Sequence, residues 1–247
     1  MAQATRTTTG EDSLSAPPGS GSRSALARRL VQLYGGLALY GISIALQLRA
    51  GLGLAPWDVL NQGVSRHTGL SMGTVTIAIG ALVLLLWIPL RQRPGLGTVS
   101  NVLVIGLAVD ATLHVVPAPP GTLWVRIPLL LFAVVLCGVA TGLYIAPRFG
   151  PGPRDGLMTG LHRRTGRSVR LVRTCIELAV LVTGFALGGS VGMGTVLFAV
   201  AIGPLAQFFL RLFARPDTST VVAAGPSSAP LATAAEEGAA HGVPDPV

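Results

Sequence analysis

The stretch "GLGLAPWDVLNQG", residues 51 to 63, interrupts a mostly apolar chain with a proline, an aspartate and several glycines. A second stretch, "RFGPGPRDGLMTG" at residues 148 to 160, repeats its pattern 97 positions later. Internal symmetry of this kind is typical of a duplicated structural unit in a membrane protein. The shared residues are Gly53, Pro56, Asp58, Leu60 and Gly63, which recur as Gly150, Pro153, Asp155, Leu157 and Gly160.

The composition indicates a membrane protein. Of the 247 residues, 50% are hydrophobic and only 11% are charged, which is not the balance of a soluble domain. Runs such as "IAIGALVLLLWIPL" are continuously apolar, which favours helices over the alternating strands of a β-barrel. A spanning helix needs roughly 20 mainly apolar residues. The sequence therefore predicts an all-α, polytopic protein with six transmembrane helices at about 30–48, 72–90, 98–116, 125–146, 174–190 and 194–213.

The six predicted helices divide into two repeats. Comparing residues 33–110 with 130–207, without a gap, gives 24 identities in 78 positions, and many of these are turn and cap residues. Each copy holds three spans, and an odd number of spans makes the second copy enter the membrane from the opposite face. We therefore expect two inverted three-helix repeats, at 25–116 and 117–213, each with a short non-spanning helix. The tails, 1–24 and 214–247, are rich in small and polar residues and are expected to be disordered.

The basic residues predict an orientation. All 18 are arginines, and a cytoplasmic N-terminus places 15 of them inside and 3 outside, as the positive-inside rule requires. This pattern predicts a multi-pass protein of a bacterial inner membrane with both termini cytoplasmic, in contact with the lipid bilayer. No recognition motif or interleaved aromatic residue accompanies the arginines, so nucleic acid is not an expected partner.

The segment between Pro56 and Gly69 is expected to form a short helix of about 11 residues. Pro56 suits a first helical position, Asp58 suits the positively polarised first turn, and Gly69 is a stop signal. About 11 residues at 1.5 Å each reach roughly 16 Å, about half of the hydrocarbon thickness. Such a helix either lies at the interface or enters the membrane as a half-helix packed on protein.

The short helices supply the candidate ligand site. Asp58 and Asp155 either cap their helices or line a polar cavity between the repeats, and Trp57 is either an interfacial anchor or a ligand platform. If the helix N-termini point to the midplane, both acids face the cavity, and each needs a partner such as Asn101, Gln207 or water, or stays protonated. The candidate ligand-binding residues are Pro56, Trp57, Asp58, Asn61, Asn101, Pro153, Asp155 and Gln207.

Other ionisable residues lie within the predicted spans. Asp110 precedes His114 by four residues, and Arg173 precedes Glu177 by four. Such groups are costly in hydrocarbon, so Asp110, His114 and Glu177 are intramembrane candidates for function, although local ion pairing near helix ends is the alternative. The sequence contains no defensible pair of nucleophile and base and no metal-ligand spacing, so neither an enzyme nor a metal or cofactor is expected.

The stretches "AGLGLAPWDVLNQGVSRHTGLSMGT" and "WIPLRQRPGLGTVSNVLVIG" resemble the YczE/YyaS/YitT-type integral membrane proteins of bacteria. The resemblance covers about residues 30–210 and implies a polytopic membrane protein without an assigned activity, in a group with some links to antibiotic production. It supplies no site residues.

The inverted repeats favour a transporter-like protein, a permease for a small-molecule solute. The alternative is a membrane regulator or scaffold that binds a partner enzyme through the arginine-rich loop at 148–173.

Overall fold

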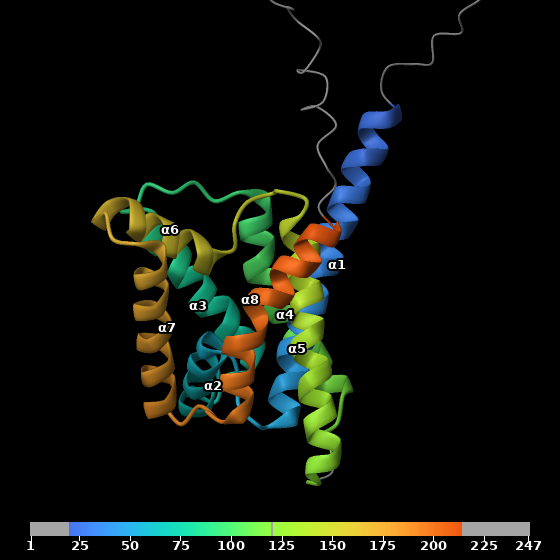
Figure 1. Cartoon of the computed structure of the whole chain (residues 1–247), viewed down its shortest axis with the longest axis vertical. Helices are drawn as coiled ribbons and strands as arrows, with labels where there is room; N and C mark the ends of the chain where they lie inside the picture. The colour runs from blue at the N-terminus through green and yellow to red at the C-terminus, as the bar shows by residue number, and fades with distance from the viewer. Residues whose placement is uncertain (1–19, 120, 214–247) are drawn as a thin grey trace, which may run out of the picture. The chain divides into compact units, whose positions relative to one another are not determined.

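The computed structural model describes residues 20–119 and 121–213, and within these ranges the chain forms eight helices and no strand (Figure 1). The all-α prediction is therefore confirmed. The tail residues 1–19 and 214–247 lie outside the described residues, and the first helix begins inside the range expected for a tail. The helices are α1 (Ser20–Ala50), α2 (Pro56–Thr68), α3 (Met72–Trp87), α4 (Leu96–Val115), α5 (Leu123–Ile145), α6 (Pro153–Thr165), α7 (Val169–Ala186) and α8 (Met193–Phe213).

Several of the helices are suited to a membrane. Taken singly, α1, α4, α5 and α8 are long and apolar enough to cross one, and α2 with α3 forms a fifth candidate that bends by 116° at a short break. α3 alone has only 16 residues, and the 18 residues of α7 include Arg170, Arg173 and Glu177. The chain is thus a multi-pass helical protein, and length and composition support four or five crossings in the described residues.

The two short helices have matching ends. Each has 13 residues, begins with proline and ends at a left-handed glycine, Gly69 with φ 76° or Gly166 with φ 67°. Glycine adopts this conformation at little steric cost, so it ends a helix efficiently. The next helices also begin alike, because the hydroxyls of Ser71 and Ser168 accept hydrogen bonds from backbone N–H groups three residues later. The sequence prediction of a short helix between Pro56 and Gly69 is confirmed.

Each short helix is preceded by a glycine linker that packs on the opposite half of the chain. The N–H of Gly194 donates to the carbonyl of Leu52 at 2.8 Å, and the N–H of Gly97 donates to that of Phe149 at 3.0 Å. Gly53 and Gly150 have φ of 115° and 122°, and any Cβ there would lie within 3 Å of atoms at the start of α8 or α4. Only glycine therefore allows these close approaches.

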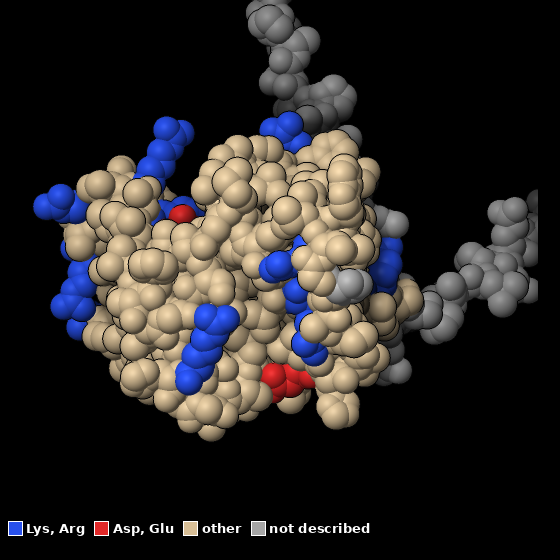
Figure 2. All heavy atoms as spheres, turned by 90° about the horizontal axis from the view of Figure 1, so that it is seen from below, with Lys and Arg blue, Asp and Glu red and all other residues tan. Residues whose placement is uncertain are grey.

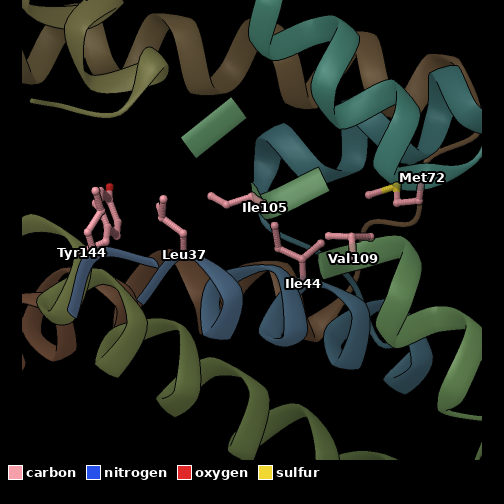
Figure 3. Close-up of a cluster of buried hydrophobic side chains, with 7 residues drawn as sticks. Leu37, Ile44, Met72, Ile105, Val109 and Tyr144 are labelled. Atoms are coloured by element: carbon pink, nitrogen blue, oxygen red, sulfur yellow. The ribbon is translucent and has the colours of Figure 1, made fainter. Parts of the chain in front are cut away.

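A buried apolar cluster holds the long helices together (Figure 3). Leu37 and Ile44 of α1 contact Ile105 and Val109 of α4, while Tyr144 joins the cluster from α5. α1 thus packs between α4 and α5, and α8 packs on the other side of α5. α2 packs on α7 instead, and α2 and α6 lie near opposite ends of the helix bundle, with the start of α1 and the end of α8 on the side of α6 (Figure 1).

Where α2 and α6 meet their neighbours, small residues face large ones. A Cβ on Gly184 of α7 would lie 2.6 Å from the backbone of Val59, so α2 and α7 are in direct backbone contact. In the corresponding contact between α6 and α3 the small residue is on the short helix, because Gly156 lies against the indole ring of Trp87. The Nε1 of Trp87 also donates a hydrogen bond to the carbonyl of Pro153 at 3.0 Å. The two halves therefore fill equivalent spaces with different side chains.

Candidate functional site

A cavity of about 310 Å³ lies where the two short helices begin. Pro56 and Trp57 line it from α2, and Pro153, Arg154 and Asp155 line it from α6. The first turns of both helices therefore face one internal space. Unpaired backbone N–H groups give these turns a positive partial charge, which favours negatively charged groups there, and the acidic residues of the two first turns are Asp58 and Asp155.

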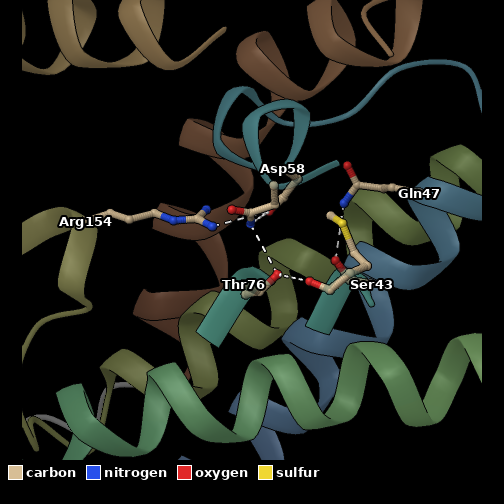
Figure 4. A network of polar contacts seen from close by, with 7 residues as sticks. Ser43, Gln47, Asp58, Thr76 and Arg154 are labelled. Carbon is tan, nitrogen blue, oxygen red and sulfur yellow. Dashed lines mark hydrogen bonds and ion pairs between the residues drawn. The ribbon is translucent and has the colours of Figure 1, made fainter. Parts of the chain in front are cut away.

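An ion pair joins the two short helices at this point (Figure 4). A terminal nitrogen of Arg154 donates to Asp58 Oδ1 at 3.3 Å, and the Asp58 side chain is only 3% exposed. The same guanidinium lies 5.1 Å from the ring centroid of Trp57, a favourable cation–π distance. Because an isolated buried carboxylate is very costly, Arg154 is what makes a charged Asp58 tolerable here.

Polar side chains continue behind this ion pair. Asn61 Nδ2 lies 3.3 Å from both Asp58 Oδ1 and the hydroxyl of Thr76, and the Thr76 hydroxyl donates to the carbonyl of Met72 at 2.8 Å. Gln47 donates to Ser43 close by, as Figure 4 shows. Three buried atoms of this region have no hydrogen-bond partner within the described part of the chain: Gln47 Oε1, Asn61 Oδ1 and Trp57 Nε1.

Asp155 lines the cavity from α6, and its side chain is exposed there. A Cβ on Gly152 would lie 3.3 Å from Asp155 Oδ2, 3.5 Å from the Tyr144 hydroxyl and 3.8 Å from the Asn101 amide nitrogen, so these groups cluster. Surrounding protein desolvates the carboxyl and raises the pKa of Asp155 above that of a free aspartate, although the positive charges of Arg173 and Arg154 act in the opposite direction. Among the described residues Asp155 forms no ion pair.

Arg173 and Glu177 contribute a second ion pair to the cavity wall. Arg173 Nε donates to Glu177 Oε1 at 2.9 Å, one turn apart on α7. This is the local pairing that their spacing predicts. Their position on the cavity wall gives both side chains access to a bound molecule.

The structure gathers most of the sequence-predicted site residues around this cavity. Asp58 and Asn61 are the exceptions among the ligand-binding candidates, because they are buried behind Arg154 and do not line the space. The residues that do line it are Pro56, Trp57, Asn101, Pro153, Asp155, Glu177 and Gln207.

Asp110 and His114 lie elsewhere. Asp110 accepts hydrogen bonds from the Ser71 hydroxyl at 2.6 Å and the Gly73 N–H at 2.7 Å, so it caps the start of α3. Within the described ranges it forms no ion pair with His114, which is exposed. The i,i+4 interpretation was wrong for this pair, because the α3 terminus offers directed donors on the other side of Asp110.

The partner of Asp58 was also wrongly predicted. The sequence suggested Asn101, Gln207 or water, but the structure supplies the guanidinium of Arg154. The sequence signal for this contact was the repeat, in which Arg154 occupies the position that corresponds to Trp57. Sequence reasoning also missed Thr76, Tyr40 and Tyr144, since neither periodicity nor spacing shows which helix faces meet.

These features define a multi-pass helical membrane protein with a polar cavity between its two short helices. The chain belongs to a family of unknown function, DUF6198, whose model matches residues 27–211. It is 44% identical over 179 residues to an uncharacterized protein of Haemophilus influenzae, covering 72% of this chain and 82% of the relative.

Two relatives come from Bacillus subtilis. The uncharacterized membrane protein YczE is 34% identical over 172 residues, covering 69% of this chain and 79% of the relative. The uncharacterized protein YyaS is 28% identical over 183 residues, covering 73% and 91%. These similarities agree with the resemblance seen in the sequence. No solved structure matches the chain.

Proposed function

We propose that this protein binds a small solute in the central cavity and carries it across the membrane, and that it is not an enzyme. The observation that carries the proposal is the meeting of two short-helix N-termini at one cavity of about 310 Å³. Helix ends that face a central space are a recurrent way to build a transporter site, since their backbone dipoles replace part of the solute's hydration.

We further propose that the chain consists of two inverted repeats with six spans. Support comes from helices that begin at positions 97 apart, at residues 56 and 153, 72 and 169, and 96 and 193. The reciprocal hydrogen bonds of the glycine linkers have the same offset, and α2 and α6 lie near opposite ends of the bundle. On this proposal α3 and α7 cross as the shorter members of each repeat.

The proposed orientation has both termini in the cytoplasm of a bacterial cell and α6 on the cytoplasmic side. The arginine distribution supports it, because the loop at 148–173 carries seven arginines and the loop at 49–71 carries two.

The transport proposal is tested by asking from which side the cavity can be reached. A cysteine-free background, Cys137→Ala with Cys175→Ala, would carry Ala206→Cys in the cavity wall. A charged, membrane-impermeant methanethiosulfonate reagent should modify this cysteine in intact cells and also in inside-out vesicles, because a transporter opens to both sides. The matched control is Leu107→Cys, which lies on an outward surface of α4 and should react slowly from either side. Modification of the cavity cysteine from one side alone would overturn the proposal.

A regulator or scaffold is the second candidate function. The observation that favours it is the exposed cluster of Arg163, Arg164, Arg167 and Arg170 at the end of α6 and the start of α7. Replacing Arg163, Arg167 and Arg170 with glutamine should then abolish co-purification of a partner enzyme from native membranes while leaving the cavity cysteine reactive as before. Unchanged co-purification would exclude this role for the cluster.

A further inference from the structure

The side wall of the cavity is closed between α3 and α4 but not between α7 and α8. In the first pair, a Cβ on Gly73 would lie 2.1 Å from the Gly106 carbonyl, so the two helices are in backbone contact. α7 and α8 have almost no backbone contact. Gly203, which corresponds to Gly106, has nothing within 4 Å of an added Cβ. The pair of α7 and α8, which corresponds to α3 and α4, is therefore not in close contact at this position.

The residues on α7 explain the separation. Gly73 and Gly80 of α3 face α4, and the positions 97 residues later hold Arg170 and Glu177. Small residues permit close helix packing in membranes, whereas long charged side chains prevent it. The charged positions of α7 thus leave an opening where the first half of the chain has a tight contact.

The gap between α7 and α8 borders the cavity, because residues of both helices line it. Arg173 and Glu177 line it from α7, and Gly203, Ala206 and Gln207 line it from α8. Gln207 also borders a second hollow, which continues along α8 past Phe208 and Leu212. This part of α8 exposes the large apolar side chains of Phe208 and Leu212 and also carries Arg211. Seen from below, the surface of the molecule in Figure 2 consists mostly of uncharged side chains with separate arginines and small acidic patches.

The depth of the opening determines what it faces. Gly203 is at the middle of α8, which is one of the helices apolar enough to span the membrane. A gap at mid-span meets lipid tails and not water. A molecule that enters this way must therefore have an apolar part.

The charges inside the cavity indicate the polar part of such a molecule. Among the described residues Asp58 is paired with Arg154 and Glu177 with Arg173, while Asp155, exposed to the cavity, forms no ion pair of its own, although the positive charges of Arg173 and Arg154 act on it. A ligand with a positive charge would complete this balance. The indole N–H of Trp57, a residue that lines the cavity and is 93% buried, also has no hydrogen-bond partner within the described part of the chain.

We propose that the gap between α7 and α8 is a lateral entrance for a cationic amphiphile, whose amine binds Asp155 while its alkyl chain lies between the two helices. The inference rests on the cavity of the proposed function and names its ligand class. Phe198 and Ile202 of α8 provide the apolar wall for the alkyl chain, and both line the cavity.

The test uses a brominated alkyl chain as a short-range quencher of Trp57 fluorescence. Trp87→Phe with Trp124→Phe leaves Trp57 as the single tryptophan, and the full-length protein is placed in lipid nanodiscs. The probe is 6,7-dibromododecylamine, whose bromines are at the middle of the chain and stay closer to the cavity than a terminal bromine would, and its carboxylate analogue, 6,7-dibromododecanoate, is the comparison. Saturable quenching by the amine at concentrations about tenfold lower than by the carboxylate is expected, since one charge contact accounts for roughly that factor.

Two variants and one matched control make the test specific. Asp155→Asn should weaken amine binding by about tenfold without changing the shape of the site, and Gly203→Leu should do the same by filling the entrance. Gly35→Leu is the control, because an added Cβ at Gly35, as at Gly203, meets nothing within 4 Å, but Gly35 does not line the cavity, so binding should be unchanged.

Each outcome separates this inference from the transport proposal. Equal quenching by amine and carboxylate, or quenching unaffected by Asp155→Asn and Gly203→Leu, would overturn the lateral entrance. If the cavity cysteine at 206 still reacts from both sides in that case, transport stands without the entrance. Saturable amine binding with modification of that cysteine from one side alone would instead support an amphiphile-binding protein that does not transport.

Discussion

Asp58 and Arg154 show how a single contact connects the two halves of the chain. The Asp58 side chain is almost fully enclosed, the Arg154 side chain is about three-quarters buried, and the distance from the Arg154 nitrogen to Asp58 Oδ1 is 3.3 Å. The aromatic face of Trp57 covers the same guanidinium. Either charge alone would be poorly solvated at this position, so each residue depends on the other.

The first prediction therefore concerns this pair. Arg154→Gln should lower the free energy of unfolding by about 3–5 kcal/mol, because Asp58 then stays buried without a counter-charge. The double variant Asp58→Asn with Arg154→Gln should recover much of the loss, since two neutral amides can hydrogen-bond to each other. Thermal unfolding in detergent would measure both changes. The mutual dependence would be contradicted if the double variant lost at least as much unfolding free energy as the Asp58→Asn and Arg154→Gln variants lose together.

Asp110 leads to a second prediction, for a residue with a capping role. Asp110→Ala should lower the free energy of unfolding by about 1–2 kcal/mol, because Ser71 and the Gly73 N–H lose their acceptor. Reactivity of the cavity cysteine at 206 should be unchanged. His114→Ala is the control and should have no effect on stability. Loss of cavity reactivity in the alanine variant of Asp110, with the fold intact, would show that the residue serves the site.

At single residues the sequence could indicate which groups matter but not which groups pair. Asp58 and Asp155 were recognised as a matched pair because they recur at a fixed offset beside prolines. The Asp58–Arg154 contact crosses between helices whose separation no spacing encodes. The i,i+4 rule worked for Arg173 and Glu177, where no competing donors intervene, and failed for Asp110, where the α3 terminus does compete.

Among the elements, the short helices were the most predictable. Proline at the start and a left-handed glycine at the end act locally, so the bounds of α2 could be derived from a few residues. The start of α7 was less well predicted. The prediction looked for continuous apolar sequence, and the charged residues between 170 and 177 interrupt it at the beginning of this helix. The start of α1 was missed for the same reason, since its first turns contain little apolar sequence.

The exchange of large and small residues gives a prediction at the scale of elements. A Cβ at Gly156 would lie 2.0 Å from the Trp87 ring, so Gly156→Ala should force α6 away from α3. The expected loss is about 1–3 kcal/mol in the free energy of unfolding, as for other overpacked sites. Adding Trp87→Leu should reverse part of that loss by removing the ring. Unfolding of the purified single and double variants measures the coupling.

Gly203→Ala is the matched control for this experiment, because the added methyl group meets nothing within 4 Å. It should leave the stability unchanged. Equal losses at Gly156 and Gly203 would mean that helix flexibility, and not contact with Trp87, sets the cost.

At the scale of the whole molecule, the 97-residue offset predicted more of the helix arrangement than the composition did. The 97-residue repeat predicted matching helices, and the described helices begin at positions separated by that offset. The sequence offered a polar cavity between the repeats as one alternative, but the full set of residues that line it could not be predicted, because the cavity depends on differences between the halves. Arg154 replaces Trp57, and charged residues on α7 replace the glycines of α3, so the second half leaves space where the first is packed.

The central claim, that the halves have opposite orientations in the membrane, is tested most directly by labelling His67→Cys and Arg163→Cys singly in the cysteine-free background. Both positions are exposed near the ends of α2 and α6, in equivalent parts of the two halves. A membrane-impermeant maleimide should label position 67 in intact cells and position 163 only in inside-out vesicles. Labelling of both positions from the same side would contradict the inverted arrangement.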